Sequence, residues 1–134
     1  MRKVFGIVAA LAAVSTVIVV GATSSAWACS CVAGSEQEYF AQAEVVFTGT
    51  VIGRDDPNSG RQIVSSGDPI DYTVNVDAVQ KGSVGDPAVV RTARDDGTCG
   101  FSFTVGRRYQ IFAQRFEGHW TTNICSGTHD LGEG

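Results

Sequence analysis

The sequence predicts an all-β domain with one short helix, stapled by two disulfides. Three observations favour this class. Segments rich in β-branched and aromatic residues recur along the chain with turn residues between them. One of them, Tyr72–Ala78, alternates apolar and polar side chains as a half-buried strand does. Four cysteines follow a segment that resembles an export signal, and an even number of cysteines in an exported chain predicts disulfides.

The first 28 residues have the organisation of a secretory signal peptide. Arg2-Lys3 gives a positively charged start, and a mostly apolar stretch runs from Val4 to Val20. The small-x-small sequence Ala26-Trp27-Ala28 predicts cleavage after Ala28. We therefore expect a signal peptide over residues 1–28 and one secreted, extracellular domain over residues 29–134.

The charge of the secreted part excludes two classes of partner. Its 106 residues carry eight Arg and Lys against 14 Asp and Glu, a net charge of −6, and Lys81 is its only lysine. Such a domain lacks the basic face that nucleic-acid phosphates require. It is equally unsuited to an anionic membrane surface. We expect a monomer with no cofactor of its own and no membrane span after signal cleavage.

The four cysteines leave two plausible pairings. A bond between Cys29 and Cys31 would close a very small, strained ring. Each of these two residues therefore pairs with Cys99 or Cys125, in one order or the other. In the loop-entropy model each such bond stabilises the fold by about 4–5 kcal/mol. A metal site of four reduced cysteines is disfavoured because the sequence lacks a Cys-x-x-Cys pair.

The elements can be assigned in order along the chain. Ser35 and Glu38 form a capping-box pattern, which predicts a short helix to about Ala43. The next strand is Val45–Ile52, and Gly49 inside it indicates a bulge or bend of the kind that small barrels need. A long polar connection, Arg54–Pro69, precedes Tyr72–Ala78. The remaining predicted strands are Ala88–Ala93, Tyr109–Ala113 and Trp120–Cys125.

Five strands and one helix in 106 residues favour a small closed barrel of the oligonucleotide-binding (OB) type. A β-sandwich is the weaker choice because it usually needs about seven strands. The apolar positions of the strands and of the segment near Phe101 supply the predicted core, which comprises Val46, Val51, Tyr72, Val74, Val76, Val89, Phe101, Tyr109, Ile111, Phe112 and Ile124.

Several motifs resemble the tissue inhibitors of metalloproteinases and the wider netrin-like family. Cys29-Ser30-Cys31-Val32, directly behind the signal site, is similar to the mature start of these inhibitors. Gly97-Thr98-Cys99-Gly100 resembles a second element of the family, and residues 106–113 and 121–125 resemble its later strands. The similarity extends over essentially the whole of residues 29–134 and suggests a bacterial-type, single-domain member of the family. It implies an OB-type barrel with Cys29–Cys99 and Cys31–Cys125 disulfides.

The sequence also departs from the family pattern in three ways. No cysteines remain for the third disulfide of the inhibitory domain. No carboxy-terminal domain follows in this sequence, and Ala33 stands where family members often have proline.

The resemblance implies a mechanism of inhibition. A catalytic zinc keeps one coordination position for water. The free α-amine and carbonyl oxygen of Cys29 would chelate that zinc in a protease and displace the water nucleophile. Ser30 would enter the first primed-side pocket of the protease. Cys31, Val32, Thr98 and Cys99 would form the surrounding ridge, and the 54–69 loop would add contacts.

Three other interpretations stay open at this point. The same barrel could be a non-inhibitory binding or structural module at the cell surface. Cys29 could be lipidated, or the signal could remain as an uncleaved anchor, since Val4–Ala22 is close to the length that spans a bilayer.

His119 and His129 are isolated, and the pairs Asp55-Asp56 and Asp95-Asp96 sit in turns. No nucleophile–base motif occurs, so we expect no enzyme.

Overall fold

Residues 29–134 are the part of the chain that this computed structural model describes, and the predicted signal peptide lies outside them. One short α-helix, six strands and a 3-10 turn follow one another in this order: α1 (Glu36–Gln42), β1 (Val45–Asp55), β2 (Pro69–Lys81), β3 (Ala88–Ala93), η1 (Asp96–Thr98), β4 (Arg107–Phe116), β5 (His119–Thr121) and β6 (His129–Glu133). Among the described residues no helix is both long and apolar enough to cross a membrane.

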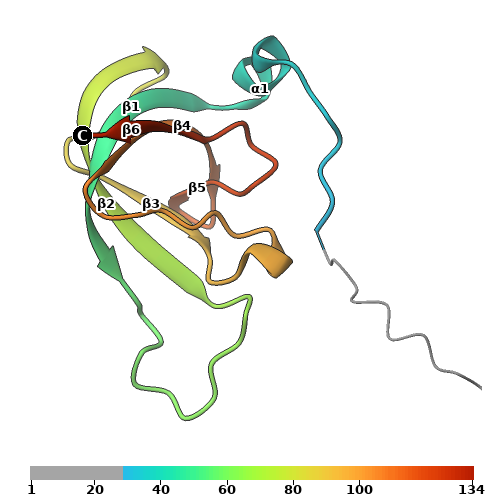
Figure 1. Cartoon of the computed structure of the whole chain (residues 1–134), viewed down its shortest axis with the longest axis vertical. Helices are drawn as coiled ribbons and strands as arrows, with labels where there is room; N and C mark the ends of the chain where they lie inside the picture. Colours follow the sequence, from blue (N-terminus) through green and yellow to red (C-terminus); the bar gives the residue numbers. More distant parts are fainter. Residues whose placement is uncertain (1–28) are drawn as a thin grey trace, which may run out of the picture.

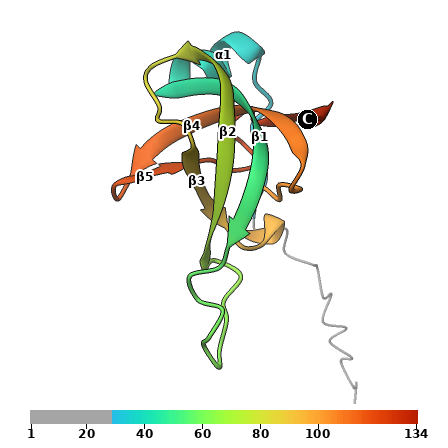
Figure 2. The same ribbon diagram turned by 90° about the vertical axis from the view of Figure 1, so that its left-hand side faces the viewer.

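Five of the strands close into a barrel, as predicted (Figures 1 and 2). The order around it is β1, β2, β3, β5 and β4, and β4 returns to β1. All neighbours are antiparallel except β3 and β5, which share one short parallel pairing. The additional strand β6 pairs with β4 outside this ring.

Closure depends on β1, which pairs on both sides. Its first half pairs with β4 while the whole strand pairs with β2. The register with β2 shifts between Thr48 and Gly49, which confirms the predicted bulge. A Cβ atom at Gly49 would lie 2.6 Å from Cγ1 of Val74 and still closer to the carbonyl oxygen of Asn75. Only glycine therefore permits the two backbones to approach at this bend.

The helix begins where the capping box predicted. The hydroxyl of Ser35 accepts the Glu38 N–H at 3.2 Å, and the carboxylate of Glu38 accepts the Ser35 N–H at 2.6 Å. These two bonds satisfy amides that the first turn of a helix leaves unpaired. The last residues of the helix then lead directly into β1.

The barrel core confirms much of the predicted set and corrects two members. Val89 is 48 % exposed, because the inward positions of β3 are Ala88, Val90 and Thr92. Ile124 is 39 % exposed because it lies in a turn rather than a strand. Val76 and Phe101 pack against the core while partly exposed. The main cluster comprises Val45, Phe47, Val51, Ile70, Tyr72, Val74, Ala88, Val90, Phe103, Tyr109, Ile111 and Ala113.

The ends of the strands differ from the prediction. The strands β1, β2 and β4 are longer than predicted, so the connection between β1 and β2 is reduced to residues 56–68. Strand β5 ends at Thr121 instead of Cys125, because Asn123 starts a turn: its side-chain oxygen accepts the Cys125 N–H at 2.8 Å. Strand β6 is not predicted from the sequence, because His-Asp-Leu-Gly-Glu has no strand-like alternation.

Candidate functional site

The N-terminal segment, defined here as residues 29–34, has no regular secondary structure and is tied to the barrel by both disulfides. Cys29 is bonded to Cys99, and Cys31 is bonded to Cys125. This is the pairing that the family resemblance implied. In Figure 1 the segment descends from α1 along the side of the barrel toward η1.

The two disulfides lie against each other. The sulfur atoms of Cys29, Cys31 and Cys125 are all within 4.8 Å of one another, and those of Cys29 and Cys125 are 3.8 Å apart. Every cysteine of residues 29–134 is oxidised. A disulfide sulfur offers no thiolate to a metal ion, so this cluster is a covalent junction rather than a metal site.

A tight turn presents Cys99 to the segment. Asp95 caps η1, and its carboxylate accepts the Gly97 N–H at 2.9 Å. This N–H, followed by the Asp96 side chain, holds the pKa of Asp95 below its ordinary value. Cys99 itself adopts a left-handed backbone conformation, with φ of 69°. The turn thus ends in a constrained residue whose side chain is fixed by the bond to Cys29.

A second turn, residues 123–126, presents Cys125. Its Ile124 N–H donates to the Cys99 carbonyl oxygen at 3.0 Å, so the two cysteine-bearing turns are also joined through their backbones. Ile124 is therefore a partly exposed neighbour of both disulfides. The sequence predicted a core position for Ile124. Its place directly before Cys125 was the signal that could have indicated a position beside the disulfides instead.

The structure brings the predicted ridge residues together at one end of the barrel. Ser30, Cys31, Val32 and Thr98 are exposed, and Cys29 and Cys99 are half-buried. Val32 is 91 % exposed. The hydroxyl of Thr98 lies 2.8 Å from the carbonyl oxygens of both Ser66 and Asp95, so its single proton is shared between two acceptors of the domain itself.

Comparison with known proteins agrees with this geometry. Residues 27–130 match the family model described as tissue inhibitor of metalloproteinase. The chain belongs to this family. A search of curated proteins found no match. The family-model match confirms the resemblance seen in the sequence. Members of this family are inhibitors of metalloproteinases rather than enzymes.

The β1–β2 loop of this tissue-inhibitor domain docks on the Cys99 turn. The carbonyl oxygens of Asp68 and Ser66 accept the N–H groups of Arg94 and Asp95 at 2.8 and 3.1 Å. At the start of the loop, Asp56 forms an ion pair with Arg94. Both ends of the loop therefore contact the segment 94–95 at the start of the turn. The tip of the loop is exposed, with Ile63 84 % exposed.

Acid is expected to release this loop. The Arg94 guanidinium, which hydrogen-bonds to Asp56, holds the pKa of that carboxyl below its ordinary value. A carboxyl whose pKa is lower in the folded chain stabilises the fold at pH values above its unfolded pKa of about 3.9. This contribution to stability is lost as the pH falls through the pKa of the folded state. We expect amide exchange of residues 56–68 to accelerate below about pH 4 relative to the intrinsic rate. Asp56→Asn should show faster exchange at pH 7 already and little further change in acid; unchanged exchange at pH 7 would contradict the role of this pair.

Gly100 is expected to tolerate no side chain. A Cβ atom there would overlap the Ala93 carbonyl oxygen and lie 2.8 Å from that of Asp95, and both are backbone atoms. Because the backbone cannot move aside cheaply, Gly100→Ala should lower the free energy of unfolding by about 1–3 kcal/mol. Urea denaturation measures this. Gly60→Ala is the control, because nothing lies within 4 Å of a Cβ atom at Gly60.

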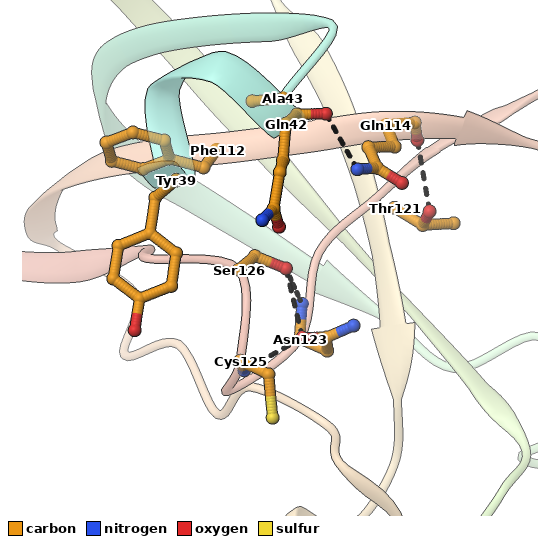
Figure 3. A pocket seen from close by; sticks show the side chains of 9 residues that line it. All are labelled: Tyr39, Gln42, Ala43, Phe112, Gln114, Thr121, Asn123, Cys125 and Ser126. Carbon is orange, nitrogen blue, oxygen red and sulfur yellow. Dashed lines mark hydrogen bonds between the residues drawn. The ribbon is translucent and has the colours of Figure 1, made fainter. Parts of the chain in front are cut away.

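A small polar pocket, lined in part by Cys125, lies between α1, β4 and the second turn (Figure 3). Its volume is about 170 Å³. The amide side chains of Gln42, Gln114 and Asn123 line it, beside the ring of Tyr39. The Gln114 amide donates to the Gln42 carbonyl oxygen at 2.8 Å. These groups are neutral, and the pocket separates the helix from the turn that carries Cys125.

Proposed function

We propose that this chain is a secreted inhibitor of a zinc metalloendopeptidase and that Cys29, as the first residue of the mature chain, is its zinc-binding group. The observation that carries the proposal is the position of Cys29. It is fixed to the Cys99 turn by one disulfide and lies 3.8 Å, sulfur to sulfur, from the other. The residues that follow it are exposed.

The chemistry requires only backbone atoms. An α-amine and the carbonyl oxygen of the same residue can close a five-membered ring on one metal ion. A hydrolytic zinc uses its open position to activate water, so a chelator in that position prevents hydrolysis. The amine must be neutral to donate its electron pair, and the reference pKa of an α-amine is about 7.7–8.0. Binding near neutral pH therefore costs little in proton release.

The disulfides give the proposal its energetic basis. A free chain end loses conformational entropy when it is ordered on a partner, at about 1–2 kcal/mol for each residue backbone. Cys29 and Cys31 are already tied to two turns that are themselves hydrogen-bonded to each other. Much of the ordering has therefore occurred before binding, which favours affinity.

The neighbouring residues fit a role in the protease cleft. Residues 30–33 make no hydrogen bond to any other part of residues 29–134, so their backbone groups are available to a partner. We propose that Ser30 enters the first primed-side pocket and that Val32 and Thr98 flank it. Cys31 and Cys99 complete the ridge as its covalent supports.

The proposal requires export and cleavage after Ala28. Intact mass of the exported protein, with and without reduction, tests both requirements. The expected mass is that of residues 29–134 less four hydrogens. A lipid on Cys29 or a retained signal would add mass, and either result would favour a membrane-attached module over an inhibitor.

The functional test is an inhibition assay against zinc endopeptidases with a chain that begins at Cys29 and a chain with one alanine added before it. Inhibition that depends on the free Cys29 amine supports the proposal. Equal inhibition by the two forms would overturn the chelation mechanism.

A further inference from the structure

We propose that Tyr39 is a positioning residue for the N-terminal segment, acting as a third attachment point beside the two disulfides. The link of this segment to inhibition rests on the proposed function. The attachment itself can be tested without any protease.

The side chain of Tyr39 fits between two glycines that lie far apart in the sequence. Its hydroxyl oxygen accepts the Gly34 N–H at 3.2 Å. A Cβ atom at Gly34 would lie 3.1 Å from Cζ of the ring, and one at Gly127 would lie 2.7 Å from Cβ and Cγ of Tyr39. The tyrosine thus contacts the end of the N-terminal segment and the backbone just beyond Cys125. The contact at Gly127, which has a φ of 94°, needs the space that only glycine leaves, and the contact at Gly34 is a tight one.

The tyrosine is itself firmly held. It packs against the small buried cluster of Ala43, Val46 and Phe112. Its N–H donates to the Ser35 carbonyl oxygen at 3.1 Å, within the capped first turn of α1. Figure 3 shows its ring extending from α1, beside Phe112, toward the loop that carries Cys125 and Ser126. The ring is therefore held by α1 and the buried cluster, so its hydroxyl is a fixed point rather than a mobile surface group.

The consequence is a segment attached at three places. Cys29 and Cys31 are bound to the two turns by disulfides, Gly34 is hydrogen-bonded to Tyr39 of α1, and Ser30, Val32 and Ala33 are exposed. A disulfide fixes a sulfur atom but leaves the backbone beside it some rotation. The bond to Gly34 limits that rotation, so it sets the direction in which Ser30 and Val32 point. Without it, Val32–Gly34 would become a free link between Cys31 and the helix.

The chain offers a closely matched control. Tyr109 also uses its hydroxyl oxygen to accept a backbone N–H five residues away, that of Thr104, at 2.8 Å. Tyr109 belongs to the main barrel core. Tyr39→Phe and Tyr109→Phe therefore remove the same kind of bond from two places, one at the segment and one inside the barrel.

The experiment measures amide hydrogen exchange of residues 30–34, thermal stability and, in a zinc-endopeptidase assay, the inhibition constant. A neutral hydrogen bond of this kind corresponds to a change of about threefold to tenfold. We expect Tyr39→Phe to accelerate exchange at Gly34 and to raise the inhibition constant by about that factor. Tyr109→Phe should lower thermal stability while leaving both quantities unchanged. Tyr39→Ala, which also frees Val32–Gly34, should raise the inhibition constant by about tenfold or more.

The outcomes separate this inference from the proposed function. If the wild-type chain inhibits no zinc endopeptidase but Tyr39→Phe still accelerates exchange at Gly34, the attachment stands and the proposed function fails. Unchanged exchange at Gly34 in Tyr39→Phe overturns the inference. Equal effects of Tyr39→Phe and Tyr109→Phe on exchange and inhibition also overturn it, because Tyr39 would then act only through overall stability.

Discussion

One alanine added before Cys29 is expected to raise the inhibition constant of this chain by about 100-fold or more. Structural zinc bound by four ligands is worth about 10–16 kcal/mol, or about 3 kcal/mol for each ligand, and about 3 kcal/mol corresponds to about 100-fold in Kd. The extension turns the Cys29 amine into an amide nitrogen, whose electron pair is delocalised into the adjoining carbonyl group and does not bind a metal ion at neutral pH. It leaves both disulfides and the ridge residues in place. The inhibition constant of each form against one zinc endopeptidase is the measurement.

Two controls make this result specific to the amine. An alanine added after Gly134 adds the same mass at the other end and should leave the inhibition constant unchanged. Cyanate at neutral pH should block the α-amine before lysine, because their reference pKa values are about 7.7–8.0 and about 10.4. Lys81 is the only lysine of residues 29–134. Lys81→Arg therefore leaves the α-amine as the sole primary amine, and full inhibition after blocking it would refute chelation.

Removal of the Cys29–Cys99 bond is expected to lower both the free energy of unfolding and the affinity for a zinc endopeptidase. The bond joins residues 70 positions apart. Loss of a native disulfide from a small secreted domain costs about 2–5 kcal/mol. The variant Cys29→Ala/Cys99→Ala keeps the α-amine and carbonyl of residue 29, so it retains the proposed zinc ligands. It should nevertheless inhibit more weakly, since the chain end must now be ordered on binding.

The matched control is Cys31→Ala/Cys125→Ala, which removes the bond between residues 94 positions apart. Denaturant unfolding should show a loss of stability in the same range for both variants. Cys29 remains tethered in the control, so its inhibition should fall less than in Cys29→Ala/Cys99→Ala. If both variants inhibit as well as the wild-type chain, rigidity of the segment contributes nothing to affinity.

Local patterns in the sequence determined the parts of the fold that depend on near neighbours. The Ser35–Glu38 capping box starts α1 as expected because its two hydrogen bonds lie within one turn. The Gly49 bulge and strand β3 were also readable, since a bend and a six-residue strand are short-range features. The disulfide pairing came from the family resemblance, because the cysteine spacing alone allowed two arrangements.

The tertiary structure decided everything that depends on residues distant in sequence. Ile124 has the composition of a core residue, yet the Asn123 turn and the bond to Cys99 place it beside the disulfides. Strand β6 forms because β4 offers it a free edge, although its own sequence has little strand character.

The contacts of Tyr39 at the candidate site also depend on residues that are distant in sequence. The sequence predicts only that Tyr39 lies within the short helix, and it is the folded chain that brings Gly34 and Gly127 to its side chain. A cysteine pattern can indicate that a segment is tethered, because the covalent partners are visible in the sequence. We infer that the direction in which that segment points depends on the Tyr39 ring, which lies between Gly34 of the segment and Gly127 beyond Cys125. Such non-covalent contacts leave no short-range pattern.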